Sequence, residues 1–280
     1  MKHHLFEAVV DLGPIGLFDS GVGGLSVLRQ LQKVLPQEDY VYFADTLHMP
    51  YGPRSKAELE RIVFGICDFL LREHCQTIVM ACNTSSALVL PLARRCYEVP
   101  LFGVLVPGAR AAAQVTSNRR IGVLATEATI RSGAYADALV SISPSIEVHS
   151  QACSSLAPMV EQGELEGAQV REAVHQCVAP LLRQGVDTLV LGCTHYPFLM
   201  PLFTQVVPPR VGLVDPAEEA AREVRAHISQ AGSGGGNTRF YVSGSVPQFA
   251  RVAEGLLCAA VRPQAVRFRE GCNGLTVGLE

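Results

Sequence analysis

Two short segments of this 280-residue chain nearly repeat each other, and each ends a run of β-prone apolar residues with a cysteine. Residues 77–84 read Thr-Ile-Val-Met-Ala-Cys-Asn-Thr, and residues 188–195 read Thr-Leu-Val-Leu-Gly-Cys-Thr-His. Each pattern predicts a buried strand that delivers a thiol, Cys82 or Cys193, to its carboxyl end, where open α/β sheets place their ligands. One such thiol would indicate a nucleophile. Two in matched settings indicate a pair of acid/base groups that face one substrate from opposite sides.

Short apolar runs alternate with helical patterns along most of the chain, which is typical of parallel β-sheets flanked by helices. Residues 15–18 resemble residues 121–124, and each segment precedes its cysteine by a similar distance. We therefore expect two related α/β domains, each with a mostly parallel sheet, and an active site in the cleft between them. The predicted first domain comprises residues 1–105 together with 216–280, and the second comprises residues 106–215.

The same patterns predict individual elements. A glycine-rich stretch, Gly232–Asn237, is expected to be a flexible surface loop, and the tail beyond Arg262 has too little periodicity to predict an element. Strands are expected near Ile15–Phe18, Tyr40–Phe43, Thr77–Ala81, Leu101–Val104, Ile121–Ala125, Ile146–His149, Thr188–Leu191, Gly212–Val214 and Phe240–Val242. Helices are expected at Leu25–Leu35, Lys56–His74, Ser85–Tyr97, Gly167–Gln184 and Ala217–Gln230.

The composition excludes several classes of protein. A net charge of −3 without a basic stripe leaves no electrostatic footprint for nucleic acid, and no apolar run approaches the ~18 residues of a membrane span. The first residues, Met-Lys-His-His-Leu-Phe-Glu, are too polar and acidic for a secretory signal. Nine cysteines without a Cys-x-x-Cys pair indicate reduced thiols rather than disulfides or a zinc site. We therefore expect a cytoplasmic protein that binds no metal, membrane or nucleic acid.

Lysine is scarce in this chain, which has only Lys2, Lys33 and Lys56. A pyridoxal-phosphate enzyme needs a lysine for its Schiff base. Lys2 lies in the terminal segment, Lys33 on the outer face of an amphipathic helix, and Lys56 at a helix start. None is well placed, so we expect no cofactor.

A glycine-rich turn, Asp19-Ser20-Gly21-Val22-Gly23-Gly24, follows the first predicted strand and opens a helix. Its backbone N–H groups could approach an anion at the helix N-terminus. The turn is not a dinucleotide fingerprint, because Ser26 stands where the third glycine belongs, and no lysine follows as in a P-loop. A carboxylate is the better ligand. The structural alternative is a tight strand-to-helix turn with Asp19 or Ser20 as the cap.

The two cysteine motifs, Cys82-Asn83-Thr84 and Cys193-Thr194-His195, each combine a thiol with polar donors and a following helix start. A helix N-terminus lowers a thiol pKa and favours the thiolate. Taken alone, either cysteine fits a small buried hydrophobe better than a catalytic group, and only the matched pair favours catalysis. His195 could be a helix-start residue rather than a proton-transfer group. Cys-x-His supplies too few ligands for a metal, and a cysteine hydrolase would use only one of the two thiols.

Two further features, residues 51–54 and Glu161, fit either a structural role or a place in the active site. Tyr51-Gly52-Pro53-Arg54 follows the second predicted strand, again at the carboxyl edge of the sheet, but it also fits a simple Pro/Gly turn. Glu161, near the end of a helical stretch, would by itself be a surface acid.

Taken together, these segments resemble glutamate racemases of the cofactor-independent aspartate/glutamate racemase family. The resemblance runs from about residue 15 to residue 230 and implies two pseudo-symmetric α/β domains with the active site between them. It also implies an isomerase that converts L-glutamate to D-glutamate for peptidoglycan synthesis and cell-wall biogenesis. The matching stretches are Ile15–Leu28, Pro50–Arg54, Val79–Ala87, Val106–Ala111, Ile121–Tyr135 and Leu189–Pro197.

The resemblance also implies roles for individual residues. Cys193 would deprotonate L-glutamate and Cys82 would deprotonate D-glutamate. Asp19 would support Cys82, whereas His195 and Glu161 would support Cys193. The implied substrate-binding residues are Asp19, Ser20, Tyr51, Gly52, Asn83, Thr84, Thr194 and His195, with Thr126 as an addition.

Some features depart from the family or leave alternatives open. Residues 44–49 are less typical of it, and Ser154 stands where proline is usual, which bears on Glu161. The first 14 residues exceed the commonest start of the family, some of whose members use such extensions for regulation by a peptidoglycan precursor. A homodimer is a further expectation. The alternatives are a related racemase that acts on aspartate or another amino acid, or a cysteine hydrolase or transferase.

Overall fold

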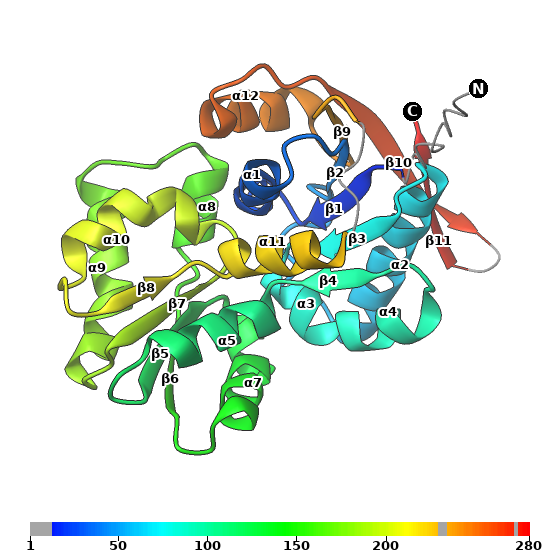
Figure 1. Cartoon of the computed structure of the whole chain (residues 1–280). Helices are drawn as coiled ribbons and strands as arrows, with labels where there is room; N and C mark the ends of the chain where they lie inside the picture. Colours follow the sequence, from blue (N-terminus) through cyan, green and yellow to red (C-terminus); the bar gives the residue numbers. More distant parts are fainter. Residues whose placement is uncertain (1–12, 229–233, 272–273) are drawn as a thin grey trace, which may run out of the picture.

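The computed structural model describes residues 13–228, 234–271 and 274–280. Its strands form two β-sheets, of which Figure 1 shows the larger at the right and the smaller at the lower left. The larger sheet has the order β11-β10-β9-β2-β1-β3-β4, and its neighbours run parallel except β10 and β11. Its strands are β1 (Ile15–Asp19), β2 (Tyr40–Ala44), β3 (Thr77–Met80), β4 (Leu101–Gly103), β9 (Thr238–Val242), β10 (Pro263–Gly271) and β11 (Gly274–Leu279).

The smaller sheet has four parallel strands in the order β6-β5-β7-β8. This order repeats β2-β1-β3-β4 of the larger sheet, so that β5 corresponds to β1 and β7 to β3. The internal repeat of the sequence is therefore a repeat of topology, and the expected α/β fold with mostly parallel sheets is confirmed. The strands are β5 (Arg120–Ala125), β6 (Glu147–Ala152), β7 (Thr188–Gly192) and β8 (Gly212–Val214).

Helices cover both sheets (Figure 1). Helix α11 packs against α1 of the larger sheet and against α5 of the smaller one, so it lies where the two sheets meet. Among the described residues, no helix is both long enough and apolar enough to cross a membrane. The helices are α1 (Leu25–Val34), α2 (Lys56–Arg72), α3 (Asn83–Leu88), α4 (Leu90–Cys96), α5 (Leu105–Val115), α6 (Glu127–Arg131), α7 (Ala134–Ile142), α8 (Leu156–Glu161), α9 (Ala168–Arg183), the 3₁₀ turn η1 (Tyr196–Leu199), α10 (Met200–Val206), α11 (Pro216–His227) and α12 (Val246–Leu257).

Side-chain caps explain several helix starts. Ser55 and Glu58 form a reciprocal capping box at α2, in which each side chain accepts from the backbone N–H of the other residue. Asp215 accepts from the N–H of Ala217 at the start of α11, directly after β8. The chain therefore returns from the smaller sheet to the larger one at a capped helix.

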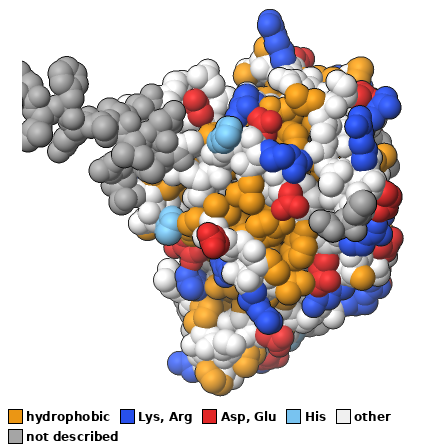
Figure 2. All heavy atoms as spheres, turned by 90° about the vertical axis from the view of Figure 1, so that its right-hand side faces the viewer, with side chains coloured by type: hydrophobic (Ala, Val, Ile, Leu, Met, Phe, Trp, Pro, Cys, Tyr) orange, Lys and Arg blue, Asp and Glu red, His pale blue; other side chains and the backbone are white. Residues whose placement is uncertain are grey.

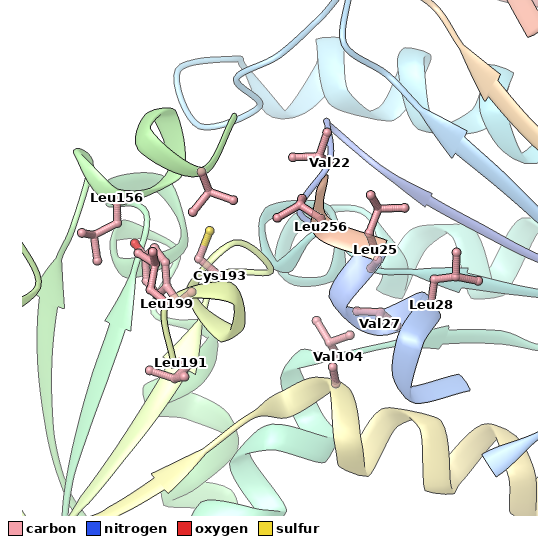
Figure 3. Packing of buried hydrophobic residues seen from close by; sticks show 14 of the residues in the cluster. Val22, Leu25, Val27, Leu28, Val104, Leu156, Leu191, Cys193, Leu199 and Leu256 are labelled. Carbon is pink, nitrogen blue, oxygen red and sulfur yellow. The ribbon is translucent and has the colours of Figure 1, made fainter. Parts of the chain in front are cut away.

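The hydrophobic core is continuous across the two sheets. One buried cluster contains Leu17 of β1 and Leu28 of α1 together with Leu191 of β7. Figure 3 shows Cys193 in this cluster, with Leu191 and Leu199 on its own side and Val22 and other residues near α1 opposite. Burial of apolar surface stabilises the folded state by roughly 25 cal/mol per Å². This shared cluster therefore helps to hold the carboxyl ends of β1 and β7 near each other.

Two parts of the expected secondary structure need correction. The single helix expected over Ser85–Tyr97 is two helices, α3 and α4, because Pro91 has no N–H to continue the helical ladder past Val89. The tail beyond Arg262, for which no element was predicted, forms the hairpin β10–β11. The nine expected strands are all present, and the two domain boundaries stay a prediction.

The C-terminal hairpin lies against α2. The carbonyl oxygen of Leu275 sits 2.8 Å from where a Cβ of Gly65 would be, so only glycine allows this approach. On the side where β11 and α2 lie, hydrophobic side chains gather in a wide band between charged ones (Figure 2). Of the expected loop Gly232–Asn237, Gly232 and Ser233 lie outside the described residues, whereas the N–H groups of Gly235 and Asn237 donate to Asp39.

Candidate active site

The two thiols lie at corresponding positions of the topological repeat. Cys82 follows β3 and is the N-cap residue of α3, and Cys193 directly follows β7. Both side chains are buried, with exposed fractions of 8% and 6%. Asp19, the last residue of β1, is fully buried near them. Because parallel strands align their carboxyl ends at one edge, the sheets bring these side chains to a common region.

Cys193 is the first member of a chain of polar contacts. Its Sγ lies 3.5 Å from Nδ1 of His195, and Nε2 of the same ring lies 2.7 Å from Oε1 of Glu161. Burial lowers the pKa of His195, but the contacts to Cys193 and Glu161 outweigh it and raise this pKa well above its ordinary value. His195 is therefore held as an imidazolium between a sulfur and a carboxylate.

The glycine-rich turn supplies the other partner of Glu161. The N–H of Val22 donates to Oε1 of Glu161 over 2.9 Å. A Cβ on Gly21 would lie 2.9 Å from Cδ of Glu161, and a Cβ on Gly23 would lie 2.6 Å from Cε1 of His195. The turn therefore needs its glycines for close approach to the other sheet. The anion that its backbone holds here is a carboxylate of the protein itself, and the interpretation of Glu161 as a surface acid is wrong.

Asp19 joins the same region from the larger sheet. Its Oδ2 accepts the N–H of Gly21 at 3.2 Å, and its Oδ1 accepts the hydroxyl of Thr194 at 3.3 Å. Ser26 of α1 adds a second link between the sheets, because its hydroxyl donates to the carbonyl of Thr194. Burial raises the pKa of Asp19, although the nearby imidazolium of His195 acts in the opposite direction.

Cys82 has a different electrostatic environment from that of Cys193. Burial raises the pKa of the Cys82 thiol to about 12, and the negative charges of Asp19 and Cys193 act in the same direction. The N–H groups of Ser85 and Thr84 at the start of α3 lower it only in part. At neutral pH Cys82 is therefore a protonated thiol in this structure.

Asn83 and Thr84 contact the helices that follow β5. The hydroxyl of Tyr135 on α7 donates to Oδ1 of Asn83 over 2.7 Å. The hydroxyl of Thr84 lies 3.3 Å from that of Thr126 and 3.2 Å from that of Thr129. These contacts join α3 to α6 and α7, and so join the two sheets on the Cys82 side as Asp19 does on the Cys193 side.

Tyr51, Gly52 and Ser20 lie beside this group without hydrogen-bonding to it. The Tyr51 hydroxyl donates to Oδ2 of the buried Asp45 at 2.8 Å, so it is already occupied. Gly52 faces α6, where Ala128 Cβ would be 3.8 Å from a Cβ at this position. Ser20 is buried between Asp19 and the glycines.

A small cavity lies beside Cys193. Asn83, Cys193 and Thr194 line a cavity of only about 10 Å³, which is close to the minimum that holds one water molecule. Its lining residues include Cys193 but not Cys82, so it lies beside one thiol rather than between the two. The described residues contain no group of three or more His, Cys, Asp or Glu side chains that could hold a metal ion.

Comparison with known proteins identifies the family. Residues 16–224 match the family model Asp/Glu/Hydantoin racemase. The chain belongs to this racemase family. It is 43% identical over 242 residues to a glutamate racemase of Nostoc sp., which covers 85% of this chain and 82% of the relative.

Solved racemase structures agree with the fold. A glutamate racemase isoform of Bacillus anthracis is 37% identical, with a TM-score of 0.86 over 91% of this chain and 97% of the other. The enzyme of Francisella tularensis in complex with D-glutamate is 30% identical, with a TM-score of 0.82 and the same coverage. The Escherichia coli enzyme, in complex with L-glutamate and the activator UDP-MurNAc-ala, is 29% identical, with a TM-score of 0.75 over 90% and 97% of the two chains.

Sequence reasoning missed three polar residues at the racemase site. Ser26 was considered only as a missing glycine, although a hydroxyl in the first turn of α1 can reach across to Thr194. Thr129 and Tyr135 follow the carboxyl end of β5, the edge that already predicted the positions of both thiols. That edge, together with the helix cap formed by Thr126 and Thr129, was the signal that could have found them.

Proposed function

We propose that this racemase interconverts L- and D-glutamate by proton transfer between the substrate α-carbon and two thiols, without a cofactor. The observation that carries the proposal is the equivalence of Cys82 and Cys193, which follow β3 and β7 of a repeated topology. The Nostoc relative and the B. anthracis protein are both named glutamate racemases. Of the two lysines that the structure describes, Lys33 lies in the last turn of α1, and Lys56 is exposed and pairs with Glu60. Neither is placed as a Schiff-base candidate.

The two thiols have the unequal environments that a two-base reaction requires. The α-proton of an amino acid is weakly acidic, so a base must act while the developing carbanion is stabilised electrostatically. The imidazolium of His195 places positive charge 3.5 Å from Cys193 Sγ, and Cys193 accepts the proton of L-glutamate. Cys82, protonated at neutral pH, donates a proton to the opposite face. The reverse sequence converts D-glutamate.

The remaining site residues would hold the substrate. Asn83, Thr84 and Thr194 offer donors for carboxylates, and Asp19 offers an acceptor for the α-ammonium group as well as a charge that keeps Cys82 protonated. Ser20, Tyr51 and Gly52 would form a wall of the pocket, with Tyr51 held in place by Asp45. Glu161 would act through His195.

We place the reaction in the supply of D-glutamate for peptidoglycan in the cytoplasm. The eight cysteines that the structure describes are free thiols, which supports a reducing compartment. The E. coli structure with an activator supports regulation by a peptidoglycan precursor here as well. A homodimer stays a prediction, which light scattering of the purified protein tests.

The deciding experiment is incubation of purified protein with L-glutamate in D₂O, with no cofactor added, followed by chiral analysis and mass spectrometry. We expect D-glutamate that carries deuterium at Cα, and parallel incubation with L-aspartate tests the alternative substrate. A cysteine hydrolase or transferase would instead give a covalent acyl adduct at one thiol and no deuterium at Cα. Absence of both D-glutamate and deuterium exchange would refute the proposal.

A further inference from the structure

One hydrogen bond at the site joins a substrate-binding candidate to a residue with no role assigned so far. The hydroxyl of Tyr135 on α7 donates to Oδ1 of Asn83 at the start of α3 over 2.7 Å. Both side chains are buried, with exposed fractions of 3% and 4%. The bond links a helix that follows β3 of the larger sheet to one that follows β5 of the smaller sheet.

This bond determines which side of the Asn83 amide carries donors. A side-chain amide has an acceptor oxygen and an NH₂ group that donates two hydrogen bonds, and rotation by half a turn exchanges them. Burial raises the pKa of Tyr135, and the charge of Asp215 acts in the same direction, so its phenol remains protonated. In the structure this hydroxyl donates to Oδ1, so the amide is held with Oδ1 toward Tyr135.

The Asn83 side chain also borders a small cavity beside Cys193. Asn83 lines the small cavity together with Cys193 and Thr194. With Oδ1 occupied, the NH₂ group is the part of the amide available to a ligand. Glutamate carries two carboxylates, which accept hydrogen bonds and are repelled by an amide oxygen.

We propose that Tyr135 is a positioning residue that locks the Asn83 amide with its N–H donors toward a carboxylate of the substrate. The inference rests on the proposed racemisation of glutamate. Tyr135 touches neither thiol through its hydroxyl, so it acts through Asn83 rather than on the reacting atoms. Without it, Asn83 can rotate, and part of the population presents an oxygen to the carboxylate.

The test compares steady-state kinetics of Tyr135→Phe with the wild type in both directions. A neutral hydrogen bond is worth roughly 0.5–1.5 kcal/mol, so we expect KM for glutamate to rise about 3- to 10-fold while kcat changes less than about 2-fold. In an Asn83→Ala background, Tyr135→Phe should raise KM no further. Tyr40→Phe is the matched control, because it removes a buried hydroxyl that bonds only the Leu35 carbonyl, at the opposite end of the sheet.

Three outcomes would overturn the inference. KM could stay unchanged in a folded Tyr135→Phe protein, or Tyr135→Phe could raise KM equally with and without Asn83, which indicates a purely structural role. The third is independent of any variant: a structure of the wild type with D-glutamate in which Asn83 Nδ2 makes no hydrogen bond to a carboxylate. If the wild type itself does not racemise glutamate, the proposed function fails. If the wild type is active and one of these outcomes occurs, only the role of Tyr135 fails.

Discussion

The contact between Glu161 and His195 allows a quantitative prediction for Glu161→Gln. The substitution keeps an oxygen for Nε2 of His195 and for the N–H of Val22 but removes the negative charge. Hydrogen bonds to charged groups contribute about 1.5–3 kcal/mol, against about 0.5–1.5 kcal/mol for neutral ones. A loss of about 1 kcal/mol at the imidazolium corresponds to roughly one pKa unit. We therefore expect the pKa of His195 to fall, and the free energy of unfolding near pH 6 to drop by about 1 kcal/mol.

The same change should make the free energy of unfolding depend on pH in a defined direction. The pKa of His195 is raised in the folded state, so its contribution to stability is fully present below the unfolded value of about 6.5. That contribution is lost as pH rises through the folded pKa. The deficit of Glu161→Gln should therefore be largest near pH 6, below the unfolded pKa of His195, and should shrink at alkaline pH.

Two measurements test this prediction. NMR titration of histidine-labelled protein follows the imidazole of His195, and urea unfolding at pH 6 and pH 9 gives the difference in stability. Glu164→Gln is the matched control, because Glu164 is an exposed acid three residues away, so it changes net charge equally without contacting the imidazole. The reasoning is refuted if the His195 titration is unchanged in Glu161→Gln. It is also refuted if the loss of unfolding free energy is the same at both pH values, because Glu161 would then not stabilise the His195 imidazolium through its charge.

Further predictions concern the thiols, the histidine and the turn. Cys82→Ser and Cys193→Ser should each nearly abolish racemisation. Each variant should still catalyse elimination of a leaving group from a β-substituted glutamate analogue, and the two variants should prefer opposite enantiomers of it. The same enantiomer preference in both would contradict the two-thiol mechanism. His195→Asn should slow turnover of L-glutamate more than that of D-glutamate, because Cys193 is the thiol that His195 contacts. Progress curves in both directions test this where proton transfer is rate-limiting. Gly23→Ala should lower kcat/KM by at least about 10-fold and destabilise by about 1–3 kcal/mol, because its Cβ would overlap Thr194 and His195. Gly255→Ala in α12, with no atom within 4 Å of its Cβ, should instead stabilise the protein.

Much of the fold was predictable because buried parallel strands leave a simple signal. Strands such as β1, β3 and β7 are buried along their whole length, so each is a short continuous apolar run between turn residues. The hairpin β10–β11 lies at the edge of the sheet, where only Val266 and Val277 are buried. With so few buried positions, its residues carry too little apolar pattern to predict it.

The positions of the two thiols were predictable for the same reason, since both end buried strands. Glu161 was not, because its partners are residues 22 and 195, which are far away in the sequence and follow strands of two different sheets. Only the family resemblance placed it beside Cys193. The contacts of Tyr135 and Thr129 likewise depend on how α6 and α7 pack against α3, and no local sequence pattern predicts that packing.

The order of strands has a consequence for synthesis of the chain on the ribosome. The smaller sheet is built from one uninterrupted stretch, whereas β2 must wait for β9, about 200 residues later, to cover its outer edge. At about 5–20 residues per second, that interval lasts roughly 10–40 s. During this time the exposed edge of β2, with the apolar sequence Tyr-Val-Tyr-Phe-Ala, is a template for strands of neighbouring nascent chains. Polysomes that carry this message therefore concentrate an aggregation hazard that the finished enzyme no longer has.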